Sequence, residues 1–354
     1  MLKLLKSHFG FDAFLPLQEE IITSVMGGQD TFALMPTGGG KSLCYQLPAF
    51  ALSGLTLVVS PLIALMKDQV DGLKANGINA AFINSSLSAQ EISRVQQLVR
   101  SGSVKMLYVA PERVTLSGVH RFLTGLDVSL IAIDEAHCIS EWGHDFRPAY
   151  RELKGLRQAF DHVPAIALTA TATERVREDI LSQLGLQKPN VFISSFNRPN
   201  LTYAVEAKKE PLAALLRLLE KHHGESAIIY CTSRRATEET AQVLSERGHN
   251  AEPYHAGLEP EVRRATQERF IRDQIPIVVA TIAFGMGIDK PDIRLVVHYD
   301  LPKSLEGYYQ ETGRAGRDGM PSECVLYYSY GDKTKQEFFI NQVEDPEEQD
   351  RARE

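Results

Sequence analysis

The stretch TFALMPTGGGKS, residues 31–42, decides the fold of this chain. Its apolar first part predicts a buried strand, which runs directly into a glycine-rich turn. In such a turn successive backbone N–H groups can face a phosphate, and the apolar stretch from Leu43 onward predicts a helix whose positive end adds to the attraction. Lys41 supplies a point charge for the β- and γ-phosphates, and the Ser42 hydroxyl can ligate Mg²⁺. The residues predicted to contact the phosphates are Thr37, Gly38, Gly39, Gly40, Lys41 and Ser42.

Strand and helix signals alternate on both sides of this loop. The apolar runs that predict strands are residues 31–35, 55–60, 104–110, 130–134, 165–170, 191–196, 227–231, 275–280, 295–299 and 324–328. Several of these runs are apolar on both faces, as expected for strands buried between helices. A capping box formed by Ser88 and Glu91 predicts one helix start, and Pro211 predicts another. The alternation predicts α/β domains with mostly parallel sheets.

The regular alternation breaks twice along the chain. The first break is FNRPNLTYA, residues 196–204, which carries Pro199 and two asparagines. The second follows Tyr330, where the sequence turns helical and acidic. We therefore expect a first domain at residues 1–199, a second at 200–335 and a charged C-terminal tail at 336–354.

Composition narrows the classes of protein that remain. With 354 residues, 44% of them hydrophobic, the chain is neither disordered nor fibrous, and it is long enough for two domains. No apolar run reaches the ~18 residues that cross a bilayer, and the N-terminus has no signal-peptide pattern, so we expect a cytoplasmic protein without membrane contact. The net charge of −7 argues against nucleic-acid binding by bulk charge alone. Such binding would depend on local groups.

The cysteines add a prediction about metals. Cys44, Cys138, Cys231 and Cys324 are scattered and lack metal-ligand spacing. We therefore expect no zinc site in this chain, and free thiols in a reducing compartment.

A second part of the candidate site is LIAIDEAH, residues 130–137, where an apolar strand ends in two carboxylates. Asp134 is suited to hold Mg²⁺, and Glu135 to orient or deprotonate an attacking water. An acidic pair after a strand is a weak signal by itself, because strand ends are often simply solvated. Together with the phosphate loop, the pair predicts a site for nucleoside-triphosphate hydrolysis.

The segment after the carboxylates, CISEWGHDFRPAY at residues 138–150, gathers aromatic and cationic side chains in a polar context. Bases stack on aromatic faces with about 1–3 kcal/mol each, largely independently of sequence. A buried core tryptophan is the competing interpretation of Trp142, but its polar neighbours favour contact with nucleic acid. The side chains predicted to make this contact are Trp142, His144, Phe146 and Arg147.

Several motifs, in this order, resemble those of superfamily 2 helicases. They are the phosphate loop, DEAH at 134–137, LTATAT at 168–173 and QETGRAGRDG at 310–319. The match tightens to the RecQ family of DNA helicases through the aromatic-rich segment 138–150, the stretch 283–319, VVSPLIALMKDQV at 58–70, YVAPERV at 108–114 and IIYCTSRR at 228–235. The resemblance extends from the N-terminus to residue 335.

This resemblance implies two tandem RecA-like domains, each a mostly parallel sheet flanked by helices, with ATP and Mg²⁺ in the cleft between them. Gln310, Arg314 and Arg317 would act at the γ-phosphate. Arg317 would be the arginine finger, a role that contributes about 10³–10⁵ in rate. The alternative is that the arginines merely solvate a turn between glycines. Asp289 would lie near the ribose or the domain interface.

The resemblance also implies contacts with DNA. The loop around Trp142 would sense single-stranded DNA and relay this to the ATP site through His137 and the hydroxyls of Thr169 and Thr171. Thr232 or Ser233 can also cap a helix, and both roles can hold at once. The residues expected in DNA binding or coupling are Ser60, Lys67, His137, Trp142, His144, Phe146, Arg147, Thr232 and Arg234.

The chain departs from the family pattern at two places. Phe11 can stack on adenine and Gln18 can pair with its edge, but Leu15 stands where the family has an arginine, so we expect a raised KM for ATP. RecQ proteins commonly continue into zinc-binding and winged-helix modules, whereas this sequence ends in PEEQDRARE without a cysteine cluster. We therefore predict ATP hydrolysis more firmly than strand separation by this chain alone.

The expected function is that of an ATP-dependent 3′→5′ DNA helicase that serves DNA repair or recombination, with single-stranded and forked DNA as partners and a monomeric core. One alternative is a DNA-stimulated ATPase or translocase without robust unwinding. Others are an RNA helicase and a nucleotide-gated binding module with little turnover. Because strand contact would depend on backbone donors and a few side chains, we expect weak, salt-sensitive DNA binding.

Overall fold

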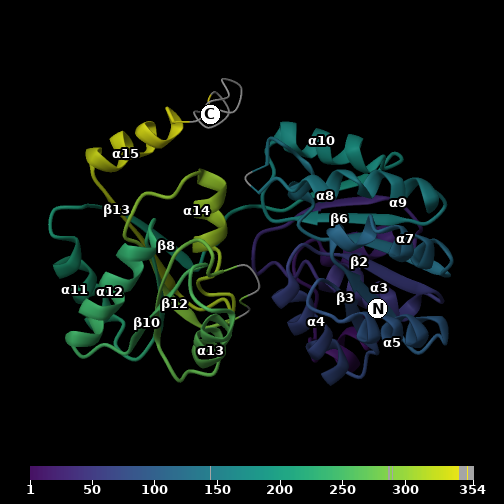
Figure 1. Cartoon of the computed structure of the whole chain (residues 1–354), viewed down its shortest axis with the longest axis horizontal. Coiled ribbons are helices and arrows are strands. Elements are labelled where there is room, and N and C mark those ends of the chain that lie inside the picture. Colours follow the sequence, from purple (N-terminus) through teal and green to yellow (C-terminus); the bar gives the residue numbers. More distant parts are fainter. Residues whose placement is uncertain (144, 286–287, 289, 343–348, 350–354) are drawn as a thin grey trace. The chain divides into compact units, whose positions relative to one another are not determined.

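The computed structural model describes residues 1–143, 145–285, 288, 290–342 and 349. The chain forms two compact units, Met1–Phe196 and Asn197–Glu354 (Figure 1). Two residues predicted for the site, His144 and Asp289, lie outside the described residues. None of the helices in the described ranges has the length and apolar character that a bilayer crossing needs.

The first unit is built on a seven-stranded parallel sheet with the strand order β3-β4-β2-β5-β6-β1-β7. Its strands are β1 (Thr31–Leu34), β2 (Leu55–Val59), β3 (Ala80–Ile83), β4 (Met106–Val109), β5 (Val128–Ile133), β6 (Ala165–Thr169) and β7 (Asn190–Ile193). All strand pairs are parallel, so their carboxyl ends share one edge of the sheet. Residues that follow β1, β5 and β6 are therefore brought together, because these three strands are neighbours in the order β5-β6-β1.

The second unit has a six-stranded parallel sheet with the order β10-β11-β9-β12-β13-β8. Its strands are β8 (Leu201–Ala207), β9 (Ser226–Tyr230), β10 (Ala251–Tyr254), β11 (Ile277–Ala280), β12 (Ile293–His298) and β13 (Ser322–Tyr328). The first strand of this unit, β8, pairs with the last, β13, from Leu201 opposite Ser322 to Ala207 opposite Tyr328.

Helices connect the strands in both units. In the first unit they are α1 (Leu2–Leu4), η1 (Leu5–Phe9), α2 (Gln18–Met26), α3 (Leu43–Ala51), α4 (Ile63–Ala75), α5 (Ala89–Arg100), α6 (Pro111–Val114), α7 (Ser117–Thr124), η2 (Ala136–Ile139), α8 (Pro148–Arg151), α9 (Leu153–Ala159) and α10 (Glu174–Leu184). In the second they are α11 (Pro211–Lys221), α12 (Arg234–Glu246), α13 (Pro260–Ile271), α14 (Leu305–Thr312) and α15 (Tyr330–Ile340). The predicted capping box of Ser88 and Glu91 opens α5, and Pro211 is the first residue of α11.

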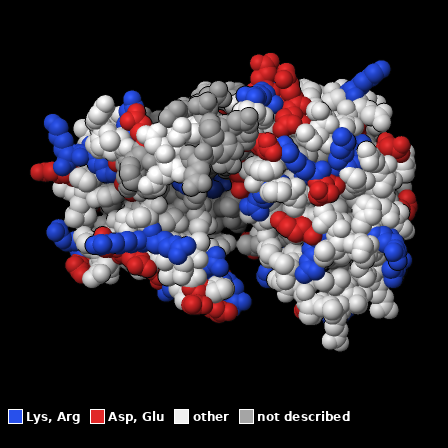
Figure 2. Space-filling view, turned by 45° about the horizontal axis from the view of Figure 1, so that its top comes forward, with Lys and Arg blue, Asp and Glu red and all other residues white. Residues whose placement is uncertain are grey.

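The surface charge is mixed. Figure 2 shows Lys and Arg side chains interspersed with Asp and Glu over the visible face of each unit, with wide uncharged areas between them. This distribution agrees with the small net charge of −7. On this face, long-range attraction for a polyanion is therefore limited, and any grip on nucleic acid depends on particular side chains.

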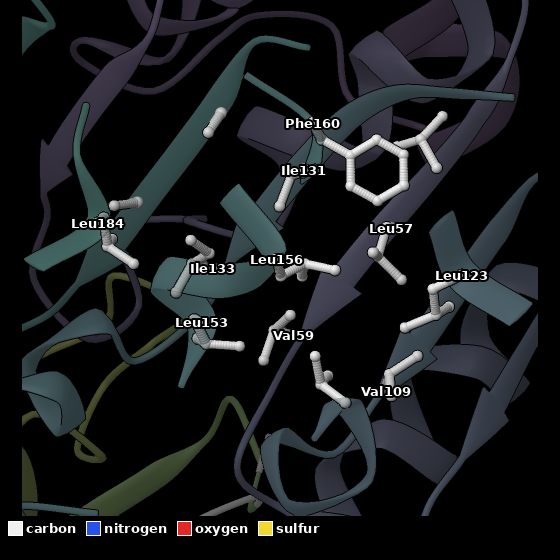
Figure 3. Close-up of a cluster of buried hydrophobic side chains, with 14 of the residues drawn as sticks. Leu57, Val59, Val109, Leu123, Ile131, Ile133, Leu153, Leu156, Phe160 and Leu184 are labelled. Carbon is white, nitrogen blue, oxygen red and sulfur yellow. The ribbon is translucent and has the colours of Figure 1, made fainter. Parts of the chain in front are cut away.

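The core lies on both faces of each sheet. In β1, Phe32 and Leu34 belong to one buried cluster, while Ala33 belongs to another on the opposite face. Figure 3 shows the first of these clusters, in which Leu57 and Val59 of β2 pack with Ile131 and Ile133 of β5. Strands that are buried on both faces explain the apolar runs of the sequence, and the predicted α/β class with parallel sheets is confirmed.

The strands that the sequence did not predict are all sheet edges. They are β3, β8 and β10. In β8 the cover is incomplete and the apolar signal is weaker, because Tyr203 and Val205 are exposed, whereas β3 is short and mostly buried. β8 begins within residues 196–204, where the sequence suggested only a break in the alternation. Pro253 lies in the edge strand β10, where a proline is tolerated.

Candidate nucleotide and nucleic-acid site

The glycine-rich turn lies between β1 and α3, as the sequence predicts. Gly38 and Gly40 have positive φ angles of 81° and 72°, which L-residues with a side chain rarely adopt. The Nζ atom of Lys41 lies 3.4 Å from the carbonyl oxygen of Met35, the last residue before the turn. Thr37, Gly39 and Ser42 complete the turn, which is partly exposed. The turn thus presents its backbone and one lysine at the carboxyl edge of the sheet.

Gln18 links the N-terminal segment to this turn. Its side-chain amide donates to the carbonyl of Gly40 at 3.1 Å, and its Oε1 atom accepts from the backbone N–H of Leu15 at 2.8 Å. Gln18 is buried, whereas Phe11 and Leu15 are exposed. The amide that was expected to pair with adenine is therefore engaged with the phosphate loop, while Phe11 is open to a ligand.

The two carboxylates follow β5. Asp134 is buried, and burial together with the neighbouring charge of Glu135 raises the pKa of its carboxyl to about 7. Lys41 acts in the opposite direction on this pKa. Tyr150 donates its hydroxyl proton to the Asp134 carbonyl at 2.8 Å and so fixes the backbone at this point. Glu135 adopts a left-handed conformation with φ of 48°, which turns the chain sharply after the strand.

A chain of polar contacts leads from Glu135 to the end of β6. The Nδ1 atom of His137 lies 3.3 Å from a Glu135 carboxylate oxygen and 2.8 Å from the Thr169 hydroxyl. The Thr169 hydroxyl donates to the carbonyl of Thr171 at 3.0 Å, and the Thr169 carbonyl accepts from the N–H of Met35 at 3.0 Å. The structure thus brings together the phosphate loop, the carboxylates and the LTATAT segment.

The aromatic side chains of segment 138–150 are paired with arginines. The guanidinium carbon of Arg175, at the start of α10, lies 3.0 Å from the centroid of the Trp142 ring. That of Arg151 lies 5.1 Å from the centroid of Phe146. Trp142 remains 37% exposed, which rules out the core interpretation of this residue. A base that stacked on the covered face would have to displace Arg175.

Arg147 connects segment 138–150 to the loop that precedes α4. Its guanidinium donates to Asp145 Oδ2 at 3.0 and 3.2 Å and to the carbonyl of Pro61 at 3.1 Å. Its side chain is therefore engaged in local structure, and a contact with DNA would have to share or replace these bonds.

The other residues predicted for DNA contact differ in their exposure. Ser60 is buried, whereas Lys67 is exposed and pairs with Asp71 at 2.7 Å. Thr232 donates its hydroxyl proton to Asp300 at 3.1 Å. Ser233, not Thr232, caps α12 by accepting from the N–H of Ala236. Arg234, the first residue of α12, packs against Gly257.

The arginines of the QETGRAGRDG motif lie in the turn after α14. Arg314 is buried and donates to the carbonyl of Gly285, and Arg317 donates to the carbonyl of Ile288 at 2.8 Å. A Cβ atom at Gly285 would collide with the Arg314 guanidinium. Gln310 lies in α14 and is half-buried. Both arginines are therefore ordered by backbone carbonyls of the second unit, and the interpretation that they only solvate a turn does not fit the buried Arg314.

Within the described residues, one group of three potential metal ligands occurs: His137, Cys138 and Asp145, whose ligand atoms lie within 4.8 Å of one another. Asp145 already accepts two bonds from Arg147. Burial raises the pKa of the Cys138 thiol and so opposes the thiolate form that binds metals. The absence of a zinc site stays a prediction.

Sequence reasoning missed the partners of the motif residues. Arg151 and Arg175 lie outside the quoted motifs, and Tyr150, the last residue of segment 138–150, had no predicted role. These residues reach the site because α8 and α10 pack beside η2. Arg175 follows the LTATAT segment by two residues, which was the one hint available in the sequence.

Known proteins resemble this chain over nearly its whole length. The DEAD/DEAH box helicase family matches residues 15–180, and the helicase conserved C-terminal domain matches residues 210–319. The ATP-dependent DNA helicase RecQ of Pasteurella multocida is 52% identical over 94% of this chain and 52% of its own length. The ATP-dependent DNA helicase RecQ of Bacillus subtilis is 48% identical over 98% of this chain and 59% of its own length.

A solved structure shares the fold. The Mycobacterium smegmatis helicase Lhr bound to single-stranded DNA and AMP-PNP aligns with a TM-score of 0.76 and 22% identity, over 96% of this chain and 49% of that one. The sheets, the phosphate loop and the two matched domains give this chain the architecture of the two helicase family models, with two RecA-like domains. The chain belongs to the RecQ family. It spans about half the length of the bacterial relatives that it matches, 52% and 59% in the two named above.

Proposed function

We propose that this chain is an ATP-dependent DNA helicase that moves 3′→5′ on single-stranded DNA and separates strands in DNA repair or recombination. Its similarity to proteins named as RecQ helicases, at 48–52% identity over nearly the whole chain, supports this proposal. The structural observation that carries it is the meeting of three strand ends: Met35 before the phosphate loop, Glu135 after β5 and Thr169 at the end of β6, joined through His137. ATP hydrolysis, and its control by a bound DNA strand, would need this connection between the three segments.

In the proposed reaction the phosphate loop binds the nucleotide. The backbone N–H groups of the loop and the positive end of α3 attract the phosphates. Lys41, whose Nζ atom lies 3.4 Å from the Met35 carbonyl oxygen at the start of the loop, is close enough to turn to the β- and γ-phosphates. Phe11, which is exposed, would stack on adenine.

The carboxylates fit a divalent cation. The Asp134 carboxylate is desolvated and is repelled by the charge of Glu135, which raises its pKa. A cation bound here would stabilise both negative charges. We propose that Asp134 and Ser42 hold Mg²⁺, which when bound neutralises charge on the phosphates. Glu135 would orient the attacking water and accept its proton, and the His137 imidazole, 3.3 Å from this carboxylate, would connect it to Thr169.

The arginines would supply the remaining charge. We propose that Arg314 and Arg317 stabilise the negative charge on the transferring phosphoryl group, with Arg317 as the arginine finger. Gln310, on the last turns of α14, would contact the same group. Asp289 is proposed to lie near the ribose or the domain interface.

DNA would be sensed by the aromatic segment. A base that stacks on Trp142 would compete with Arg175, and Arg175 lies at the start of the helix that follows the LTATAT segment. Movement there would reach Thr169 and then His137. Lys67, Thr232 and Arg234 would contact the strand backbone.

The remaining proposals concern partners and surroundings. Single-stranded and forked DNA are the proposed partners, and the core is proposed to act as a monomer. The four cysteines are free and buried, which is consistent with a reducing compartment, and the cytoplasm is the proposed location.

The proposal is tested by ATP turnover with and without single-stranded DNA, with RNA of the same sequence as the comparison. We expect strong stimulation by DNA, little by RNA, and no turnover in Lys41→Ala. Lys105→Ala, which removes a lysine that bonds carbonyls far from the phosphate loop, is the matched control and should retain turnover. A forked duplex then tests strand separation.

Two results would contradict the proposal. Equal or greater stimulation by RNA would favour an RNA helicase. A wild type that hydrolyses ATP without any response to DNA would remove the coupling between the Trp142 segment and the ATP site. Stimulated hydrolysis without unwinding would instead restrict the function to a translocase.

A further inference from the structure

The segment that directly follows the boundary between the two compact units is bonded to the turn that carries the arginines. The guanidinium of Arg198 donates to the carbonyls of Ala315 at 3.0 Å and Gly316 at 2.7 Å. It also reaches the carbonyl of Gly313 at 3.4 Å. These carbonyls lie on both sides of Arg314 and immediately before Arg317 in the chain. One side chain thus holds three peptide groups of the turn.

Asn200, two residues after Arg198, is bonded to the same turn. Its side-chain amide donates to the carbonyls of Gly316 and Met320, both at 2.9 Å. Gly316 has a φ of +54°, and a Cβ atom there would lie 2.5 Å from the Asn200 amide nitrogen. The turn is therefore shaped to receive this amide. The Asn200 carbonyl also accepts from the N–H of Ser322 at 2.9 Å, which places the segment beside the start of β13.

The chemistry of these two side chains suits the task of fixing a backbone. A guanidinium presents five N–H donors in a rigid plane, so that it can hold several carbonyls in fixed directions, which a lysine ammonium cannot do. An asparagine amide has two donors, and here both are used on carbonyls of the turn. Arg198 and Asn200 therefore restrict the positions from which Arg314 and Arg317 extend.

We propose that Arg198 and Asn200 are positioning residues for ATP hydrolysis, which fix the backbone of residues 313–316 and tie the first residues of the second unit to the arginine turn. The inference rests on the proposed role of Arg314 and Arg317 in hydrolysis. A displacement of about 1 Å in such a group can cost about 100-fold in rate. The clamp formed by Arg198 and Asn200 thus makes the arginines sensitive to the conformation of the chain at residue 198.

The first experiment measures kcat and KM for ATP, with saturating single-stranded DNA, in Arg198→Lys and Asn200→Asp. Both substitutions keep the size of the side chain but remove donors. We expect kcat to fall about tenfold or more and KM to stay within about twofold, because the arginines are used mainly in the transition state. An unchanged kcat in both variants would overturn the inference.

A matched control separates positioning from general loss of stability. Arg269 in α13 makes two bonds of 2.6 Å to Glu252 of β10, at the opposite edge of the same sheet. Arg269→Lys therefore makes the same chemical change in the same unit without touching the turn. We expect it to retain kcat. A loss of kcat equal to that of Arg198→Lys would overturn the inference.

A double-mutant cycle tests whether Arg198 acts through Arg317. In an Arg317→Ala background the finger is already lost, so Arg198→Lys should lower kcat much less than it does in the wild type. Full additivity of the two losses would show that Arg198 does not act through this arginine and would overturn the proposal.

Hydrogen exchange keeps the inference testable without activity. We expect the amides of residues 311–320 to exchange faster in Arg198→Lys than in the wild type, and to be unchanged in Arg269→Lys. Equal exchange in Arg198→Lys and wild type would overturn the positioning inference whatever the turnover. A wild type that shows no ATP turnover would instead overturn the proposed function, so that the two failures can be told apart.

Discussion

The Nδ1 atom of His137 lies 2.8 Å from the hydroxyl of Thr169 and 3.3 Å from the carboxylate of Glu135. One buried imidazole therefore contacts both the residue proposed to orient water and the strand end that leads to the LTATAT segment. Since Thr169 also accepts the N–H of Met35 on its carbonyl, the imidazole is connected to the phosphate loop as well. This arrangement suits a coupling residue more than a residue that acts on the phosphate directly.

We predict that His137→Ala keeps basal ATP turnover and loses stimulation by single-stranded DNA. The reason is that Glu135 stays in place while its link to Thr169 is removed. Coupling free energies between sites usually amount to 1–3 kcal/mol, so we expect stimulation to fall by about 5–150-fold. The measurement is the ratio of turnover with and without DNA. Thr169→Val, which removes only the hydroxyl, should produce a partial loss, and full stimulation in both variants would contradict the relay.

A second prediction concerns Trp142 and the arginine over its ring. Trp142→Ala should keep basal turnover but raise the DNA concentration for half-maximal stimulation, because a stacked base is lost at about 1–3 kcal/mol. Arg175→Met uncovers the ring and should leave that concentration unchanged or lower. A Trp142→Ala variant with the wild-type DNA dependence would remove the stacking role.

A third prediction uses the raised pKa of Asp134, which is about 7 in the folded chain against an ordinary value of 3.8. Because the folded state binds this proton more tightly than the unfolded state, the carboxyl lowers stability as pH rises between these values. Asp134→Asn should therefore raise Tm by a few degrees at about pH 8, and less at about pH 5, while ATP turnover is lost.

The control for this effect is Asp161→Asn, the same substitution at an exposed carboxylate. Its Tm should follow the wild type at both pH values. If Asp134→Asn were less stable than the wild type at about pH 8, the carboxyl would not be the unfavourable buried charge that we infer.

A fourth prediction concerns Leu15, which is exposed beside the phosphate loop. An arginine at this position could cover the face of adenine opposite Phe11, so Leu15→Arg should lower KM for ATP by a few fold. Leu15→Lys adds the same charge without a planar group and should have a smaller effect. An unchanged KM in Leu15→Arg would remove the explanation of the raised KM.

The sequence predicted the centres of the sheets better than their edges. Runs such as residues 275–280 are buried on both faces and are apolar throughout, whereas β8 exposes Tyr203 and Val205 and gave no strand signal. The positions of the motif residues at the centre of the first sheet could also be predicted. Lys41, Asp134 and Glu135 follow strands whose ends the parallel sheet must bring together.

What the sequence could not predict is which side chains meet across the fold. Nothing in the spacing indicates that Gln18 bonds Gly40 or that Arg175 covers Trp142, because these contacts depend on how helices pack against the sheet edge. The contacts of Arg198 and Asn200 with the arginine turn could not be predicted for the same reason. Both residues lay in a segment that the sequence marked only as a break between domains.

The pairing of β8 with β13 affects how the protein can fold during its synthesis on the ribosome. Leu201 and its partner Ser322 are separated by most of the second unit, so the first strand of that unit waits for the last to be synthesised. Until then β8 has no partner strand, and β12 presents the bare edge that β13 will cover, which is the kind of surface through which nascent chains aggregate. A transcript truncated before codon 322 would therefore yield a chain whose first unit can fold while its second stays open and prone to capture by chaperones.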